Sequence, residues 1–467
     1  MSFSISATIA IKNLFLKGKN VIISIMKIQF LGATKTVTGS CFLLEIKGTN
    51  ILIDCGFFQE DSLEYLNYEP FAFNPKKIDF VILTHAHLDH SALIPKLFRE
   101  GFKGKVITTP STKDLLEIML FDALKVQKNE HYKQPLYDEE NIYKALKFTD
   151  VLKYNQVLNL KGINLTLYDA GHILGSASVK LEIDGKNIVF SGDIGRKNYP
   201  ILRDPEPPSR ADWLVLESTY GNRMHKTLNQ SIDELLQAIK ETFKRGGNVI
   251  IPAFAVGRTQ DLLYILNRSV KQGLIEPINV YLDSPLAEEA TKVYLSHPEV
   301  FDDEALKEMR NPKRTSIKLH FVKTVDESKR LNNIKSHSVI IAGSGMCQGG
   351  RIIYHLYHNI HREECGIIFV GFQAKGTIGR KIIDGEKEIL LLGKMVPVRA
   401  KIYTIGGFSA HADQSELMDW LSVIKGNPEV FLVHGEESVI ESFKNSILER
   451  FNFKCHIPDR LAVYELT

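Results

Sequence analysis

The chain changes its pattern of apolar residues twice along its length. From Met26 to about Leu216 the apolar segments are short, typical of strands, and separated by Gly, Asn and Asp turns. From about Tyr220 to Val396, strand, small-residue turn and helix alternate, as in a parallel sheet with crossover helices. The remaining residues return to the first pattern. The simplest architecture is therefore one domain interrupted by another, with its two segments meeting again in space.

We predict an α/β protein whose domain boundaries follow these changes. Residues 26–219 and 396–467 are the two segments of the first domain, and residues 220–395 form the inserted domain. Residues 1–25 contain no acidic residue, and lysines interrupt their apolar stretches, so they fit a secretory signal poorly. Because "MKIQFLGA" from Met26 already makes a complete first strand, we treat residues 1–25 as a leader whose place in the mature protein is left open.

Composition narrows the class of protein. Lys plus Arg number 58 against 55 for Asp plus Glu, so the net charge of +3 indicates no polyanion partner by bulk electrostatics, and a nucleic-acid site would need a local patch. The five cysteines form no CxxC pair, which favours reduced thiols over a disulfide framework. No apolar run reaches the ~20 residues of a membrane-spanning helix. We therefore expect a cytoplasmic protein without a membrane partner.

The segment Thr84–His90, "THAHLDH", concentrates metal-binding side chains. It follows "IDFVILT", which predicts a buried strand, and it precedes a helix predicted over Ser91–Glu100. The cluster therefore lies in the loop at a strand's carboxyl end, where α/β sheets commonly present ligands. Three histidines and an aspartate in such a loop predict a metal site.

Further donors stand at the ends of other predicted strands, namely Asp54, His172, Asp193 and His434. Each alone is unremarkable, since an aspartate after a strand is usually a turn former and a lone histidine is usually hydrogen-bonded. The candidate metal ligands number seven: His85, His87, Asp89, His90, His172, Asp193 and His434. One zinc ion takes about four ligands, so the full set exceeds one site. Nitrogen and carboxylate donors without thiolate favour Zn²⁺ over Mg²⁺ or Ca²⁺.

These motifs resemble the metallo-β-lactamase superfamily and, more specifically, its β-CASP nucleases, which include the cleavage subunit of pre-mRNA 3′-end processing and its bacterial and archaeal relatives. "LESTYG" with Glu217, "GGFSAHAD" with His411 and "LVHGE" with His434 are similar to that family's motifs A, B and C. The resemblance covers nearly everything after Met26. It implies an αββα sandwich interrupted by a β-CASP domain with a parallel sheet.

The resemblance also implies how the donors are divided between two Zn²⁺ ions. Asp193 would bridge the ions, and the other ligands would form one set of His85, His87 and His172 and a second set of Asp89, His90 and His434.

Further roles follow from the same resemblance. Glu217 would pair with His411, which would protonate the leaving oxygen or steady the phosphate. Asp54 would orient the metal ligands, and Asp89 would serve catalysis as well as metal binding. In the inserted domain, phosphate contacts would come from Ser344, Lys375 and Arg380.

An RNA substrate and phosphodiester hydrolysis are the implied function. Endonuclease action is favoured, with 5′–3′ exonuclease action as a second mode. One alternative is a hydrolase of small esters or thioesters, which would have no use for so long an insertion. Another is a DNA nuclease, although the family's DNA-repair branch lacks the histidine found at His434. A silent RNA-binding subunit would have lost ligands that this chain retains. A homodimer is left open.

Overall fold

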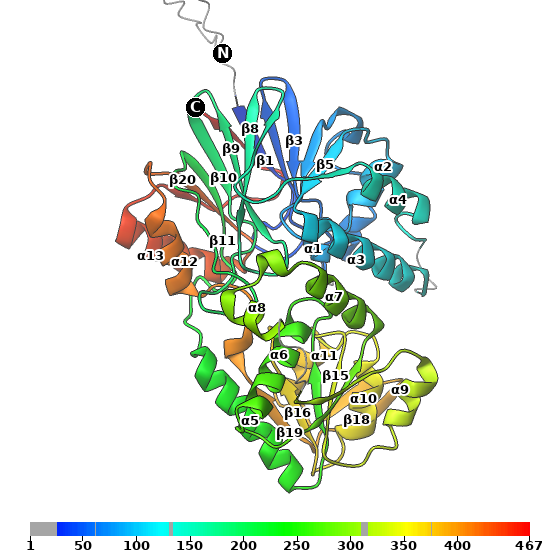
Figure 1. Ribbon diagram of the computed structural model, residues 1–467. Coiled ribbons are helices and arrows are strands. Elements are labelled where there is room, and N and C mark those ends of the chain that lie inside the picture. Colours follow the sequence, from blue (N-terminus) through cyan, green and yellow to red (C-terminus); the bar gives the residue numbers. More distant parts are fainter. Residues whose placement is uncertain (1–25, 61, 130–133, 310–315, 375) are drawn as a thin grey trace, which may run out of the picture.

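Three large sheets organise the molecule, as the computed structural model shows (Figure 1). The structure describes residues 26–60, 62–129, 134–309, 316–374 and 376–467. The expected leader and Lys375 lie outside the described residues. Among the described helices, none is long and apolar enough to cross a membrane.

Two sheets of seven strands each pack face to face as a sandwich. Both sheets contain strands from the end of the chain beside strands from its beginning, so the two segments of the sandwich do meet in space. The first sheet has the order β22 (Val463–Leu466), β1 (Met26–Phe30), β2 (Phe42–Ile46), β3 (Thr49–Ile53), β4 (Phe80–Ile82), β5 (Lys105–Thr108), β6 (Thr149–Val151). The second has the order β21 (Cys455–His456), β20 (Glu429–Val433), β11 (Trp213–Glu217), β10 (Lys186–Phe190), β9 (Ala177–Ile183), β8 (Ile163–Asp169), β7 (Val157–Leu160).

Helices cover both outer faces of the sandwich, which makes it the predicted αββα arrangement (Figure 1). The first sheet is covered by α1 (Leu88–Ser91), α2 (Ile94–Arg99), α3 (Pro110–Asn129) and α4 (Glu139–Lys147). The second is covered by α12 (Gln414–Val423) and α13 (Glu437–Phe451). The helix predicted over Ser91–Glu100 is present as α2, but it begins at Ile94, and Ser91 belongs to the separate helix α1. Pro95 lies in the first turn of α2, where its missing N–H is tolerated, so a new helix begins there.

The inserted domain is built on a six-stranded sheet in which every pair is parallel. Its order is β14 (Lys318–Phe321), β13 (Asn279–Asp283), β15 (Ser338–Ala342), β12 (Val249–Pro252), β16 (Gly366–Phe369), β19 (Lys401–Thr404). One face packs on α5 (Leu228–Lys244), α6 (Arg258–Lys271) and α7 (Pro285–Ser296). The other packs on α9 (Val325–Leu331), α10 (Ile352–Asn359), α11 (Ile378–Ile383) and the hairpin of β17 (Glu388–Leu391) and β18 (Lys394–Pro397).

Strand β19 shows that the inserted domain extends beyond its predicted end at residue 395. It lies beyond that boundary, yet it pairs in parallel with β16, with Ile402 opposite Ile367. Its own residues are only half-buried, because it is the edge strand of the sheet. The sequence therefore lacked the continuous apolar run of a central parallel strand, and pairing with β16 decided where β19 belongs.

The inserted domain docks on the sandwich through a shared apolar cluster. Val256, Tyr294 and Phe301 of the inserted domain pack in one cluster with Leu174 and Ile201 of the sandwich. Figure 1 shows the inserted domain against the end of the sandwich opposite the chain termini. This contact places the carboxyl edge of the inserted sheet at the edge of the sandwich where the predicted metal ligands lie.

Candidate metal centre

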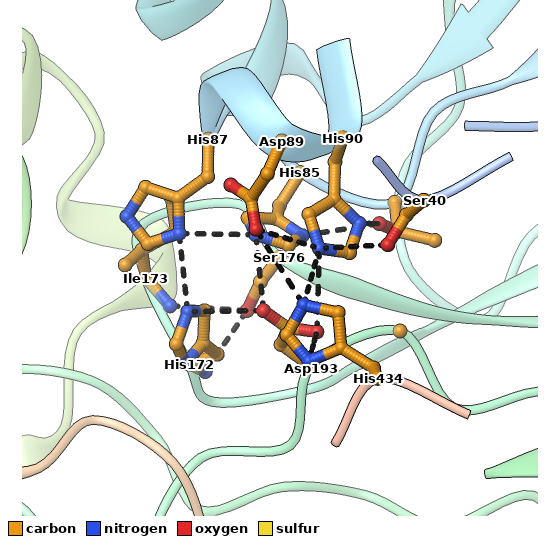
Figure 2. A network of polar contacts seen from close by, with 12 residues as sticks. Ser40, His85, His87, Asp89, His90, His172, Ile173, Ser176, Asp193 and His434 are labelled. Carbon is orange, nitrogen blue, oxygen red and sulfur yellow. Dashed lines mark hydrogen bonds and ion pairs between the residues drawn. The ribbon is translucent and has the colours of Figure 1, made fainter. Parts of the chain in front are cut away.

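The predicted metal ligands follow four strands of the two sandwich sheets. The loop after β4 carries His85, His87, Asp89 and His90, the last two on the short helix α1. The other three, His172, Asp193 and His434, follow β8, β10 and β20 of the second sheet. Figure 2 shows all seven side chains converging on one region.

Four of these side chains form a first group. Nδ1 of His87 lies 3.1 Å from Nε2 of His85 and 3.2 Å from Nε2 of His172. Oδ2 of Asp193 lies 3.5 Å from Nε2 of His85 and 3.7 Å from Nε2 of His172. In a tetrahedral zinc site with bonds of about 2.0–2.1 Å, ligand atoms stand about 3.4 Å apart. The group therefore has the dimensions of one zinc site.

A second group lies beside the first. Nε2 of His90 lies 3.4 Å from Nε2 of His434. Oδ2 of Asp89 lies 3.5 Å from Nε2 of His434 and 3.7 Å from Nε2 of His90. These separations again match neighbouring ligands of one ion.

Asp193 joins the two groups. While its Oδ2 faces His85 and His172, its Oδ1 lies 3.4 Å from Nε2 of His90. This Oδ1 is buried and has no hydrogen-bond partner among the described residues. A buried carboxylate oxygen without a partner is destabilising, and a bound cation would satisfy it. The donor set and this oxygen together fit a metal at each group.

Hydrogen bonds from neighbouring side chains orient two of the candidate ligands, His90 and His434. His90 Nδ1 donates to Asp54 Oδ2 at 2.7 Å, which leaves Nε2 of His90 facing the other donors. Thr84 holds that carboxylate, through its backbone N–H to Oδ1 at 2.7 Å and its hydroxyl to Oδ2 at 2.8 Å. His434 is held by Thr219, whose Oγ1 lies 3.0 Å from His434 Nδ1 and donates to Glu217 at 2.6 Å. Thr219 was not among the predicted site residues, although it lies inside "LESTYG" beside Glu217.

Burial sets the protonation of the first group. It lowers the pKa of His85 and of His172 well below the ordinary value, and it lowers the pKa of His87 to about 4. These three imidazoles are therefore neutral at pH 7, the form that binds metal. For His90, burial alone would lower the pKa, but the carboxylates of Asp193 and Asp89 raise it well above the ordinary value.

Glu217 and His411 form the predicted pair next to both groups. His411 Nδ1 lies 3.2 Å from Glu217 Oε1, and the same oxygen accepts the backbone N–H of Ile194 at 2.7 Å. The His411 ring lies 4.5 Å from the ring of His172 and 5.9 Å from that of His434. Burial would lower the pKa of His411, but Glu217 raises it to about 9. His411 therefore carries a proton at neutral pH.

The predicted substrate-binding residues lie apart from this cluster in the described contacts. Ser344 follows β15 and donates to the carbonyl of Gly349 at 3.3 Å, so its hydroxyl closes its own loop. Arg380 on α11 is paired with Asp384 at 2.9 Å and is well exposed. No described hydrogen bond or ion pair joins Ser344 or Arg380 to the seven donors, and their contact with substrate stays a prediction.

Three family models match consecutive parts of the chain. They are the metallo-beta-lactamase superfamily over residues 34–253, the Beta-Casp domain over residues 259–382, and the Zn-dependent metallo-hydrolase RNA specificity domain over residues 395–458. The chain is also 42% identical over 415 residues to Ribonuclease TTHA0252 of Thermus thermophilus, covering 88% of this chain and 94% of the relative. The chain belongs to the β-CASP family of the metallo-β-lactamase superfamily.

Other relatives agree with this membership of the β-CASP family. Transcription termination factor FttA of Methanosarcina mazei is 36% identical over 460 residues, which covers 94% of this chain and 72% of that protein. A solved structure, of a protein of unknown function from Enterococcus faecalis V583, superposes with a TM-score of 0.57 at 15% identity and covers 95% of this chain and 100% of that one. At this identity the likeness shows the fold alone. The predicted family and fold class are confirmed.

Proposed function

We propose that this β-CASP protein is a di-zinc ribonuclease that hydrolyses phosphodiester bonds in RNA. The observation that carries the proposal is the pair of donor groups joined by Asp193, with His411, hydrogen-bonded to Glu217, beside both. The names of the relatives, a ribonuclease and a transcription termination factor, support RNA as the substrate. The match of residues 395–458 to an RNA specificity domain supports it further.

The side chains divide the work of hydrolysis between them. The first and second donor groups would each hold one Zn²⁺, with Asp193 shared. Bound zinc supplies positive charge to the phosphate and lowers the pKa of a coordinated water towards ~7. His411, held through Nδ1 by Glu217, keeps Nε2 for proton donation to the leaving 3′ oxygen. The products would be a 5′-phosphate and a 3′-hydroxyl.

The alternatives are less consistent with the molecule. A small ester or thioester needs no second domain, yet here a parallel-sheet domain is docked at the metal edge through a shared apolar cluster. A DNA substrate is disfavoured because this chain has His434, whereas the family's DNA-repair branch lacks the corresponding histidine. Endonuclease action is proposed ahead of 5′–3′ exonuclease action.

The cytoplasm is the proposed compartment, since all five cysteines are unpaired. A homodimer stays a prediction.

The test is RNA cleavage by the purified protein, its Asp89→Ala variant and its His172→Ala variant. We expect close to two zinc ions per chain in the wild type, degradation of unstructured RNA, and loss of cleavage in both variants without unfolding. Mapping the product ends of one RNA with 5′-hydroxyl, monophosphate or triphosphate ends would separate internal cutting from end-dependent trimming. Absence of bound transition metal together with intact RNA would sink the ribonuclease proposal.

A further inference from the structure

Arg196 is a buried arginine that the catalytic scheme leaves without a role. It lies three residues after Asp193 in the same loop, and its side chain is 9% exposed. Its guanidinium donates through Nη1 to the carbonyl of Gly407 and through Nη2 to that of Lys226 at 3.3 Å. Its Nε lies 3.4 Å from the carboxylate of Glu416. The hydrogen bonds of this buried cation go to the two carbonyls, while the contact with Glu416 is an ion pair only, and together they tie these groups to one side chain.

Both carbonyls belong to segments that connect the two domains. Lys226 lies between β11 of the sandwich and α5 of the inserted domain, and Gly407 lies between β19 and α12. The two segments touch, because a Cβ on Gly407 would stand 3.1 Å from the carbonyl oxygen of Lys226. Arg196 therefore ties both connections to the loop that carries Asp193.

The segment held at Gly407 also carries His411. Two further bonds run the same way: Tyr199 donates its hydroxyl to the carbonyl of Phe408 at 3.3 Å, and Ala412 donates its N–H to Ile194 at 2.8 Å. The stretch between residues 407 and 412 is thus anchored at both ends to the loop after β10. His411 reaches the donor groups from a segment with its own fixed attachment.

We propose that Arg196 is a positioning residue for the reaction, which fixes His411 over the donor groups by anchoring the connecting segment at Gly407. This inference rests on the proposed ribonuclease function. Arg196 touches neither the candidate ligands nor His411, so it would act only through the backbone that carries that imidazole. Misplacement of a catalytic group by about 1 Å can slow a reaction about 100-fold, so loss of this anchor is expected to be visible in kcat.

The test is a double-mutant cycle in RNA cleavage with Arg196→Met, His411→Ala and the combined variant. We expect Arg196→Met to lower kcat about 10- to 100-fold, with KM changed less than about threefold and bound zinc unchanged. Arg196→Lys should recover part of the loss, since an ammonium can still bind one carbonyl. In the His411→Ala background, Arg196→Met should change kcat less than about twofold, because Arg196 acts by positioning the His411 imidazole, which this background lacks.

Arg99→Met is the control, since Arg99, although exposed, also donates to two backbone carbonyls, those of Pro135 and Leu136, away from the candidate metal centre. It should leave kcat unchanged. If Arg196→Met does not fold, Tyr199→Phe replaces it and should show the same coupling to His411→Ala with a smaller, several-fold loss. This change deletes the bond to the carbonyl of Phe408 and also the bond that the Tyr199 hydroxyl accepts from Arg258. Equal losses with and without His411 would overturn the inference, whereas a wild type that leaves RNA intact would instead overturn the proposed function.

Discussion

At the scale of single residues, the two oxygens of Asp193 explain how seven side chains form one centre. Each oxygen faces histidine nitrogens of a different donor group. Removal of this carboxylate would weaken metal binding by both groups at once, whereas removal of His87 or Asp89 would remove a ligand from one group only. His411 lies beside both groups and pairs with Glu217. These two side chains also form a third group of possible ligands with Asp193, so metal analysis of a His411 variant decides whether His411 is a ligand.

His411→Ala should slow RNA cleavage about 10²- to 10⁴-fold while leaving zinc content unchanged, because a general acid is lost and no metal ligand is removed. Single-turnover cleavage and metal analysis of the same sample measure the two quantities. His361→Ala, which removes an exposed histidine of the inserted domain, is the control and should cleave normally. Loss of zinc from His411→Ala would show that His411 is a ligand instead.

The sequence was sufficient to propose the seven donors, because every one lies just after a predicted strand or at the helix entrance beside it. It could not supply their partners. The bonds from Thr84 to Asp54 and from Thr219 to Glu217 depend on how neighbouring strands are aligned. The contacts of Arg196 could not be predicted either, because its carbonyl partners lie in segments that meet only in the folded chain.

At the scale of elements, the loops before β2 and after β3 set the position of α1. Cys55 donates its N–H to the carbonyl of His90 at 2.7 Å, and Ser40 donates to that of Asp89 at 2.8 Å. Gly56 lies so close to this helix that a Cβ there would stand 1.7 Å from the Asp89 carbonyl oxygen. The helix that carries two candidate ligands is thus packed directly against backbone.

Gly56→Ala should therefore destabilise the fold by about 1–3 kcal/mol and lower zinc content, because α1 must move to admit a methyl group. Urea unfolding and metal analysis report the two effects. Gly371→Ala is the matched control, since no atom lies within 4 Å of the Cβ position there. An unchanged unfolding midpoint for Gly56→Ala would contradict the close packing.

A second contact between elements connects the domains through His297, just after α7. Its Nε2 lies 2.7 Å from Asp114 Oδ2 on α3, and its Nδ1 lies 2.8 Å from Glu299 Oε1. Burial would lower the pKa of His297, but the two carboxylates raise it above the ordinary value of 6.5. The protonated form is therefore favoured by folding.

The pH dependence of stability follows from that direction. The stabilisation from His297 is fully present below the unfolded pKa of 6.5 and is lost as the pH rises through the raised folded pKa. His297→Gln should thus lower the free energy of unfolding at pH 6 and have a smaller effect at pH 9. Urea titrations at both pH values measure this difference, and an equal effect at both would contradict it.

At the scale of the whole molecule, we expect the two domains to unfold as one cooperative unit, because they share an apolar cluster. Phe301 of the inserted domain is buried in the cluster that also contains core residues of the sandwich. The two tryptophans, Trp213 and Trp420, both lie in the sandwich, on β11 and α12. Their fluorescence therefore reports on one domain only.

Phe301→Ala should lower the unfolding midpoint seen by tryptophan fluorescence, with a loss of about 3–5 kcal/mol, although the change lies in the other domain. Phe321→Ala on the edge strand β14, where the ring is 39% exposed, should have little effect. If Phe301→Ala leaves the unfolding midpoint seen by tryptophan fluorescence unchanged, the two domains unfold independently.

The interrupted architecture was predictable because the apolar pattern changes where the chain leaves the sandwich. The docking of the domains was not, since Tyr294 lies on the helix α7 and Val256 in the turn before α6, and periodicity cannot show what either side chain packs against. The end of the inserted domain was misplaced because β19 is an edge strand that lacks the fully buried pattern of β12, β15 and β16 beside it in the sheet.

The order of the ligands along the chain has a consequence for biogenesis. His85, His87, His172 and Asp193 all precede the inserted domain, whereas His434 follows it. A ribosome synthesises the chain from its amino end, so the first donor group exists in full before the inserted domain has been translated, and the second does not. The proposed second zinc site would therefore be completed, and the proposed cleavage of RNA would begin, only after His434 has been synthesised.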